Sequence, residues 1–191
     1  MAEILLFHHA LGLTPGVQSF ADTLRANGHV VHVPDLFEGA TFPTVEDGVA
    51  HAEQIGFDTV LARGRKVAEE LPAALVYAGF SLGVMPAQLL AQTRPGARAA
   101  LLLHGAVPPS EFGTWLDGVP VQMHTMEDDD WGDVDVAREI AATVDGAELF
   151  VYPGDRHLFT DAGLSDHHDE VAAAQVMLRV LGFLERVDRR P

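Results

Sequence analysis

The segment Gly79-Phe80-Ser81-Leu82-Gly83 constrains this chain more than any other feature. It lies between an apolar run at residues 73–78 and a helix-like run at residues 85–92, which is the strand–turn–helix context that a G-x-S-x-G motif requires. The turn is so sharp that side chains two positions before and two positions after the serine would collide. Glycine at both positions removes the Cβ atoms and so prevents the collision. The serine hydroxyl is then exposed, and the Leu82 amide at a helix start can receive an oxyanion. The segment predicts a nucleophilic serine rather than an incidental one.

Apolar runs alternate with segments of helical period along the whole chain, which is typical of an α/β fold with a parallel sheet. The run at residues 99–103 is apolar without alternation, as in a strand buried on both faces. Residues 35–49 and 104–118 are expected to be irregular loops. No repeat or linker interrupts the pattern, so we expect a single domain over residues 1–191. Strands are expected at residues 4–7, 30–33, 73–78, 99–103, 119–124 and 148–152, and helices at 15–27, 57–71, 85–92, 136–144 and 171–181.

Composition excludes several classes of function. The formal net charge of −16 argues against nucleic acid or an anionic membrane as a partner, because both require basic patches. The chain contains no cysteine, hence no disulfide, no thiolate metal site and no cysteine nucleophile. We expect the N-terminal segment not to be a signal peptide, because it carries Glu3 in place of a basic region. No apolar run approaches the ~20 residues of a membrane span. We expect a cytoplasmic protein, a monomer or homodimer.

A serine nucleophile needs a base, and the base needs a carboxylate that orients it. In open parallel sheets, functional groups gather where strands end. His157 follows the last expected strand and is favoured as the base, whereas His8, His9, His104 and His124 also follow strand ends and are rivals. The acid is expected in the run from Glu127 to Asp130, with Asp129 favoured and Asp128 second. The order Ser, Asp, His along the chain is that of the α/β hydrolases.

The loop after the first strand is the expected source of a second oxyanion donor. Gly12 permits a tight turn there, and the backbone amide of Ala10 is the favoured donor. Side chains expected to line the substrate pocket are His9, Phe37, Trp115, Trp131 and Phe159.

Six segments together resemble the dienelactone hydrolase family, a compact branch of the α/β hydrolases, nearly end to end. They are His9-Ala10-Leu11-Gly12, Pro34-Asp35-Leu36-Phe37, Gly79 to Gly83, Leu103-His104-Gly105, Glu127-Asp128-Asp129 before Trp131, and Tyr152 to Phe159. The resemblance implies a three-layer α/β-hydrolase fold, a mostly parallel sheet with helices on both faces. It also implies Ser81, His157 and Asp129 as a triad and the Ala10 and Leu82 amides as the oxyanion hole. We expect attack on the carbonyl of a small ester or lactone, without a cofactor.

Three departures from the family pattern bear on substrate and nucleophile. Named members carry a cysteine where this chain has Ser81, and Val84 replaces a glycine frequent after the elbow. True dienelactone hydrolases hold a substrate carboxylate with arginines, one of them shortly after the catalytic histidine. Asp161 stands in that region here and is expected to repel a carboxylate. The fold and the triad are therefore carried over, and the substrate is not.

The sequence admits three other interpretations. The ten histidines, among them His8-His9 and His167-His168, suggest a zinc site. Zinc needs three or four converging ligands, but neighbouring residues on a strand, such as His8 and His9, point to opposite faces. We therefore expect no bound metal. A binding protein that has lost activity is a second alternative, which an intact triad argues against. Acyl transfer or perhydrolysis by the same triad is a third, and the residues do not separate it from hydrolysis.

Overall fold

The computed structural model describes residues 1–190 and contains one six-stranded sheet in the order β2-β1-β3-β4-β5-β6. Every neighbouring pair of strands is parallel. All strands therefore end at the same edge, and side chains that follow them can meet there. The strands are β1 (Glu3–Phe7), β2 (Val30–His32), β3 (Val76–Phe80), β4 (Ala99–Leu103), β5 (Val121–Met126) and β6 (Ala147–Tyr152).

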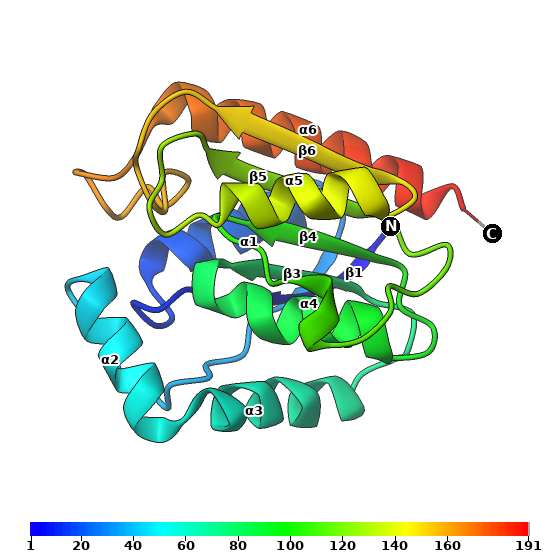
Figure 1. The fold of residues 1–191 in the computed structure, drawn as a ribbon, viewed down its shortest axis with the longest axis horizontal. Helices are drawn as coiled ribbons and strands as arrows, with labels where there is room; N and C mark the ends of the chain where they lie inside the picture. Colours follow the sequence, from blue (N-terminus) through cyan, green and yellow to red (C-terminus); the bar gives the residue numbers. More distant parts are fainter. Residues whose placement is uncertain (191) are drawn as a thin grey trace.

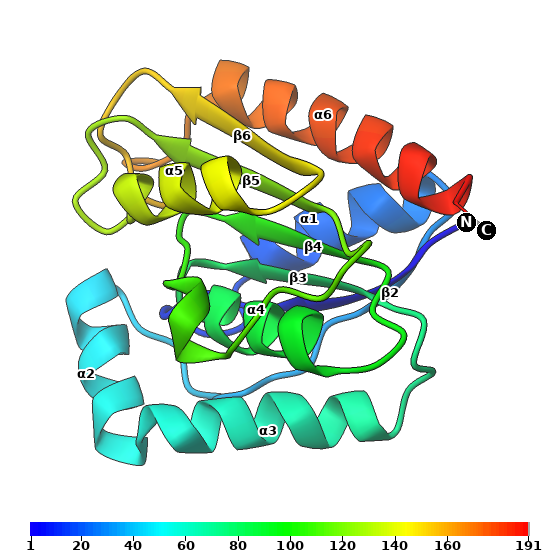
Figure 2. The ribbon, with the colours of Figure 1, turned by 45° about the vertical axis from the view of Figure 1, so that its right-hand side comes forward.

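Helices cover both faces of the sheet, as expected (Figure 1). Helices α1 and α6 pack on one face, and α3, α4 and α5 on the other, with α2 beyond the edge where the strands end (Figure 2). Two hydrophobic clusters, one on each face, result from this arrangement. The helices are α1 (Pro15–Ala26), α2 (Val45–Ile55), α3 (Phe57–Glu69), α4 (Val84–Thr93), α5 (Val134–Thr143) and α6 (Glu170–Asp188), with 3₁₀ turns at Ser81–Gly83 and Pro109–Glu111.

Local sequence explains where several elements begin. Thr14 caps α1 by accepting the Val17 amide, and Pro15 occupies its first turn. The carboxylate of Asp169 caps α6 in the same way through the Ala172 amide. Strand β5 starts only at Val121, because Pro120 has no amide hydrogen to contribute to the ladder.

The expectation of an irregular loop over residues 35–49 was wrong at its end, because α2 begins at Val45. The Thr44 hydroxyl caps this helix by accepting the Asp47 amide at 3.2 Å. Gly48 reads as a helix breaker in the sequence, but it serves close packing. A Cβ atom at this position would lie 2.0 Å from the carbonyl oxygen of Ala10. Helix α2 thus rests directly on the loop that follows β1.

No helix among residues 1–190 combines the length and the apolar character needed to cross a membrane.

Candidate active site

The turn after β3 has the steric constraints that the motif implies. A Cβ atom on Gly79 would lie 2.1 Å from the carbonyl oxygen of Gly83, and one on Gly83 would lie 2.5 Å from that of Phe7. Ser81 itself has φ +47°, a left-handed conformation that is unfavourable for a residue with a side chain. The prediction that both glycines are sterically required is confirmed. The turn presents Ser81 at the edge where β1 and β3 end.

Ser81, His157 and Asp129 form one chain of hydrogen bonds. The Ser81 Oγ atom lies 2.8 Å from His157 Nε2, and His157 Nδ1 lies 2.8 Å from Asp129 Oδ2. A carboxylate only accepts hydrogen bonds, so the imidazole proton is on Nδ1 and Nε2 is free to accept from the serine hydroxyl. His157 is 4% and Asp129 5% exposed, so little water competes for these contacts. In such an arrangement a histidine can act as a base on the serine hydroxyl while the carboxylate orients it.

Asp129 differs from the other carboxylates of residues 127–130 in being buried. Glu127, Asp128 and Asp130 are exposed, and Glu127 pairs with Arg138. The second oxygen of Asp129 accepts the Trp131 amide at 3.0 Å, which fixes the carboxylate at the end of β5.

Each rival histidine bonds a group other than Ser81. The His8 ring accepts the Leu36 amide at 2.9 Å and donates to the His9 carbonyl, and the His124 ring contacts Gln122 and Tyr152. Burial lowers the pKa of His8 to about 4 and that of His124 to about 3. Both rings are therefore neutral near pH 7.

His104 is fully buried beside the site and shares a 2.7 Å hydrogen bond with the Thr160 hydroxyl through Nε2. Burial lowers its pKa well below the ordinary value. Its Nδ1 atom has no hydrogen-bond partner within the described residues, and its backbone is left-handed, with φ +62°.

A surface cleft of about 340 Å³ opens at Ser81. Its wall includes Ser81, Leu82, Met85, Val107, Trp131 and Asp133. Of the five expected pocket side chains, Trp131 lines this cleft, and its ring centre is 6.4 Å from that of His157.

The other four expected wall positions need correction. Phe37 packs in the core against His8 at 4.9 Å between ring centres, and Phe159 packs on His104 at 4.6 Å. The Trp115 indole donates to the Val119 carbonyl and packs against the hydrophobic cluster that contains α3 and α4. His9 faces Asp161. Spacing along the chain put these residues near strand ends, but it could not tell which way each side chain turns.

Asp133 is a wall residue that sequence reasoning missed. It precedes α5 in a left-handed conformation with φ +49°, and its side chain makes no capping hydrogen bond to that helix. Burial and the nearby Asp129 charge raise the pKa of its carboxyl group. The available signal was its position two residues after Trp131, in the loop where β5 ends.

The loop after β1 is tightly organised around Ala10. The Leu11 amide donates to His9 Nδ1 at 3.3 Å, and the Gly12 amide donates to the His9 carbonyl at 3.0 Å. Among residues 1–190 the Ala10 amide has no such acceptor. Leu82 follows the serine in the 3₁₀ turn ahead of α4. The backbone just before Ala10 lies against the serine turn, because a Cβ atom on Gly83 would be 2.6 Å from the His8 carbonyl oxygen. The oxyanion hole formed by the Ala10 and Leu82 amides stays a prediction.

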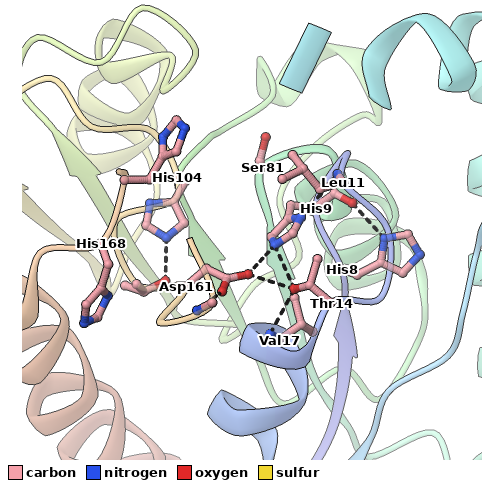
Figure 3. Close-up of polar contacts among 12 residues, drawn as sticks. His8, His9, Leu11, Thr14, Val17, Ser81, His104, Asp161 and His168 are labelled. Atoms are coloured by element: carbon pink, nitrogen blue, oxygen red, sulfur yellow. Dashed lines mark hydrogen bonds and ion pairs between the residues drawn. The ribbon is translucent and has the colours of Figure 1, made fainter. Parts of the chain in front are cut away.

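Asp161 does not have the place that the sequence predicted. Its carboxylate is 4% exposed and accepts hydrogen bonds from His9 Nε2 at 2.9 Å and from the Thr14 hydroxyl at 2.8 Å (Figure 3). It does not line the cleft at Ser81, so it is not the group that would repel a carboxylate substrate.

The histidines and carboxylates of residues 1–190 were considered above as possible metal ligands. Over residues 1–190, no group of three or more His, Asp or Glu side chains has an arrangement that could hold a metal ion. His167 and His168 instead bond the backbone carbonyls of His157 and Phe159.

Several known proteins are similar to this chain in sequence or in fold. Residues 1–188 match the profile of the dienelactone hydrolase family. A carboxymethylenebutenolidase of Rhodococcus opacus is 30% identical over 213 residues, covering 96% of this chain and 80% of the relative. Among solved structures, a dienelactone hydrolase-like promiscuous phosphotriesterase from metagenomic libraries has TM-score 0.77 at 16% identity, over 98% of this chain and 87% of that one. A dienelactone hydrolase from Anabaena variabilis has TM-score 0.68 at 16% identity, over 97% and 86%.

Proposed function

The chain belongs to the dienelactone hydrolase family and is a carboxylic ester hydrolase, and we propose that it works as a serine hydrolase through an acyl-enzyme. The observation that carries the proposal is the continuous chain of 2.8 Å hydrogen bonds from Ser81 through His157 to Asp129. This arrangement lets an imidazole take the serine proton as the serine attacks.

In the first half-reaction, Ser81 Oγ attacks the ester carbonyl while His157 Nε2 accepts its proton. Asp129 stabilises the imidazolium that forms. The amides of Ala10 and Leu82 hold the oxyanion of the tetrahedral intermediate, and the loss of one such donor typically raises the barrier by ~3 kcal/mol. His157 then protonates the leaving alcohol. In the second half-reaction, His157 activates a water molecule that releases the acid and regenerates Ser81.

The charges around the cleft bear on which esters bind. Among the described residues that line it, Asp133 carries the one formal charge, and no lysine or arginine is present. Nothing in this wall would neutralise a substrate carboxylate, and Asp133 would repel it. We therefore propose small uncharged or cationic esters as substrates, rather than anionic lactones. Trp131, which is 42% exposed, offers an aromatic face at the same wall.

Turnover of p-nitrophenyl acetate and butyrate by the wild type and Ser81→Ala tests the proposed reaction, with a metal chelator present. We expect turnover that the chelator leaves unchanged and that the substitution abolishes. A fluorophosphonate probe should label Ser81 in the wild type, because only an activated serine reacts with it. Equal turnover by both proteins, or an unlabelled serine, would contradict the proposal.

A further inference from the structure

A second buried histidine–carboxylate pair lies beside the one at Ser81. His9 is 1% and Asp161 4% exposed, and 152 positions separate them in the chain. His9 belongs to the loop after β1, and Asp161 to the loop that follows His157. Figure 3 shows His9 and Thr14 both directed at the same carboxylate. The reaction proposed above assigns this pair no role.

The surroundings hold the carboxylate in one place. The Gly163 amide donates to its other oxygen at 2.7 Å. A Cβ atom on Gly16 would lie 1.5 Å from that oxygen, so glycine is required at this point of α1. Burial alone would raise the pKa of Asp161, but hydrogen bonds from His9 and Thr14 hold it below the ordinary value. The void bordered by His9, Phe80 and Asp161 has no room for a water molecule that could replace the contact.

Both ring nitrogen atoms of His9 form hydrogen bonds, one within the loop after β1 and the other to the loop after β6. The Leu11 amide donates to Nδ1, so the imidazole proton is on Nε2 and is donated to Asp161. The His9 carbonyl also accepts the Gly12 amide and the His8 ring. These contacts bracket Ala10 on both sides and leave its amide without a protein acceptor among residues 1–190. The orientation of the His9 ring thus fixes the peptide that would hold the oxyanion.

Asp161, the second member of the pair, belongs to the turn that directly follows His157. The Asp161 amide donates to the Leu158 carbonyl at 2.9 Å, which closes a turn that starts one residue after His157. Leu158 itself is left-handed, with φ +61°. The backbone of Asp161 therefore belongs to the turn that follows the base, while its carboxylate bonds the ring of His9 in the turn that contains Ala10.

We propose that His9 and Asp161 are positioning residues that hold the Ala10 amide in register with His157, so that oxyanion binding and proton transfer occur at the same carbonyl. The proposal rests on the function proposed above. It explains why an acidic residue occupies this position: its partner is a loop of the protein, and not the substrate. A displacement of about 1 Å between such groups is enough to slow a reaction by about 100-fold.

Substitutions at position 9 separate the two contacts of the ring. Glutamine carries its amide nitrogen near the place of Nε2 and retains a donor to Asp161. Asparagine has its amide near the place of Nδ1 and loses that donor. We expect kcat for p-nitrophenyl butyrate to fall about 10- to 100-fold in Asp161→Asn and His9→Asn, with KM within about threefold of the wild type. His9→Gln should retain at least about a third of the wild-type kcat.

A readout of oxyanion binding distinguishes positioning from a purely structural role. A trifluoromethyl ketone adds to the serine and forms a tetrahedral oxyanion, so its inhibition constant should rise in proportion to the loss of kcat. Tyr77→Phe is the matched control. It removes a hydroxyl that accepts a 2.7 Å hydrogen bond from Arg94 and leaves the loops after β1 and β6 unchanged. It should lower the melting temperature and leave kcat and inhibitor affinity unaltered.

The outcomes are distinct. Equal kcat in His9→Asn and His9→Gln, or an Asp161→Asn defect no larger than that of Tyr77→Phe, would overturn the positioning role while the serine hydrolase proposal stands. If Asp161→Asn does not fold, the comparison of kcat between His9→Asn and His9→Gln still tests the positioning role. Wild-type protein without Ser81-dependent turnover would overturn both proposals.

Discussion

The Nε2 atom of His157 lies 2.8 Å from the Oγ atom of Ser81, although 76 positions separate the two residues. Ser81 follows β3, and His157 follows β6, with β4 and β5 between these strands in the sheet. The loop after the edge strand β6 must therefore reach back across the sheet edge to the serine. The turn at Leu158 to Asp161 and the buried Asp129 contact hold it there.

Removal of the orienting carboxylate should slow turnover far more than removal of its neighbour. We expect Asp129→Asn to lower kcat for p-nitrophenyl butyrate by about 10³- to 10⁴-fold, because the imidazole loses the group that fixes its tautomer. Asp128→Asn is the matched control, since its side chain is exposed, and it should stay within about twofold. Steady-state kinetics at pH 7 measures both. The reverse ranking would make Asp128 the acid and leave the triad itself in place.

Substrate charge should matter through Asp133. Three p-nitrophenyl esters, of butyric acid, of 4-(trimethylammonio)butyric acid and of glutaric acid as its monoester, differ chiefly in charge. We expect kcat/KM to be lowest for the anionic ester. In Asp133→Asn, the ratio of kcat/KM between the cationic and the anionic ester should be smaller by roughly threefold to tenfold at low salt. Asparagine tolerates the left-handed backbone at this position.

The control for that substitution is Asp145→Asn, which makes the same charge change before β6, at the opposite edge of the sheet. It should leave the ranking of the three esters unaltered. An anionic ester that is hydrolysed as fast as the neutral one would contradict the charge preference, whatever the Asp133 variant does.

Two glycine-to-alanine substitutions should have opposite effects on stability. Gly79→Ala places a Cβ atom 2.1 Å from the Gly83 carbonyl oxygen, so the turn must shift, and we expect a loss of about 3 kcal/mol or more. Gly182→Ala lies inside α6, where the new Cβ atom would be 3.6 Å from the Arg186 guanidinium, and should stabilise the protein by about 0.5–1 kcal/mol. Denaturant unfolding measures both. A Gly79→Ala protein as stable as the wild type would show that the turn is not under this steric constraint.

Acid should destabilise the protein well above the pH at which carboxylates titrate. His8, His104 and His124 are neutral when folded, with pKa about 4 for His8 and about 3 for His124, whereas an unfolded histidine titrates near 6.5. The unfolded state then binds more protons below pH 6.5, and stability falls as pH is lowered toward 4. Each such histidine adds about 1.4 kcal/mol per pH unit to the slope.

His124→Gln tests this linkage, because glutamine does not titrate. The free energy of unfolding, measured between pH 6 and pH 4.5, should depend on pH with a slope smaller by about 1.4 kcal/mol per pH unit than in the wild type. The lowered pKa of Asp161 adds a further loss that starts near pH 5, where an unfolded carboxylate begins to bind protons. This loss is the same in both proteins and cancels in the difference between their slopes. An unchanged slope would mean that His124 is protonated in the folded protein.

Short-range patterns predicted those features of this protein that depend on local sterics and periodicity. The two glycines flanking Ser81 follow from the collision across one turn, and alternating runs indicate which segments are strands and helices. The α/β fold and the family are confirmed. The position of α2 was not predicted, because Gly48 looks like a helix breaker until its contact with the Ala10 carbonyl is known.

Local patterns were enough to predict the serine turn, the succession of strands and helices along the chain apart from α2, and a short set of histidines and carboxylates near the strand ends, because these depend on neighbours a few residues apart. Long-range contacts select the histidine that meets Ser81 and the carboxylate of the run that is buried, and they turn Phe37 and Phe159 into the core. It also turned Asp161 from an expected pocket charge into the partner of His9. Side-chain direction in a loop depends on contacts with residues 28 to 152 positions away, and no local pattern encodes those distances.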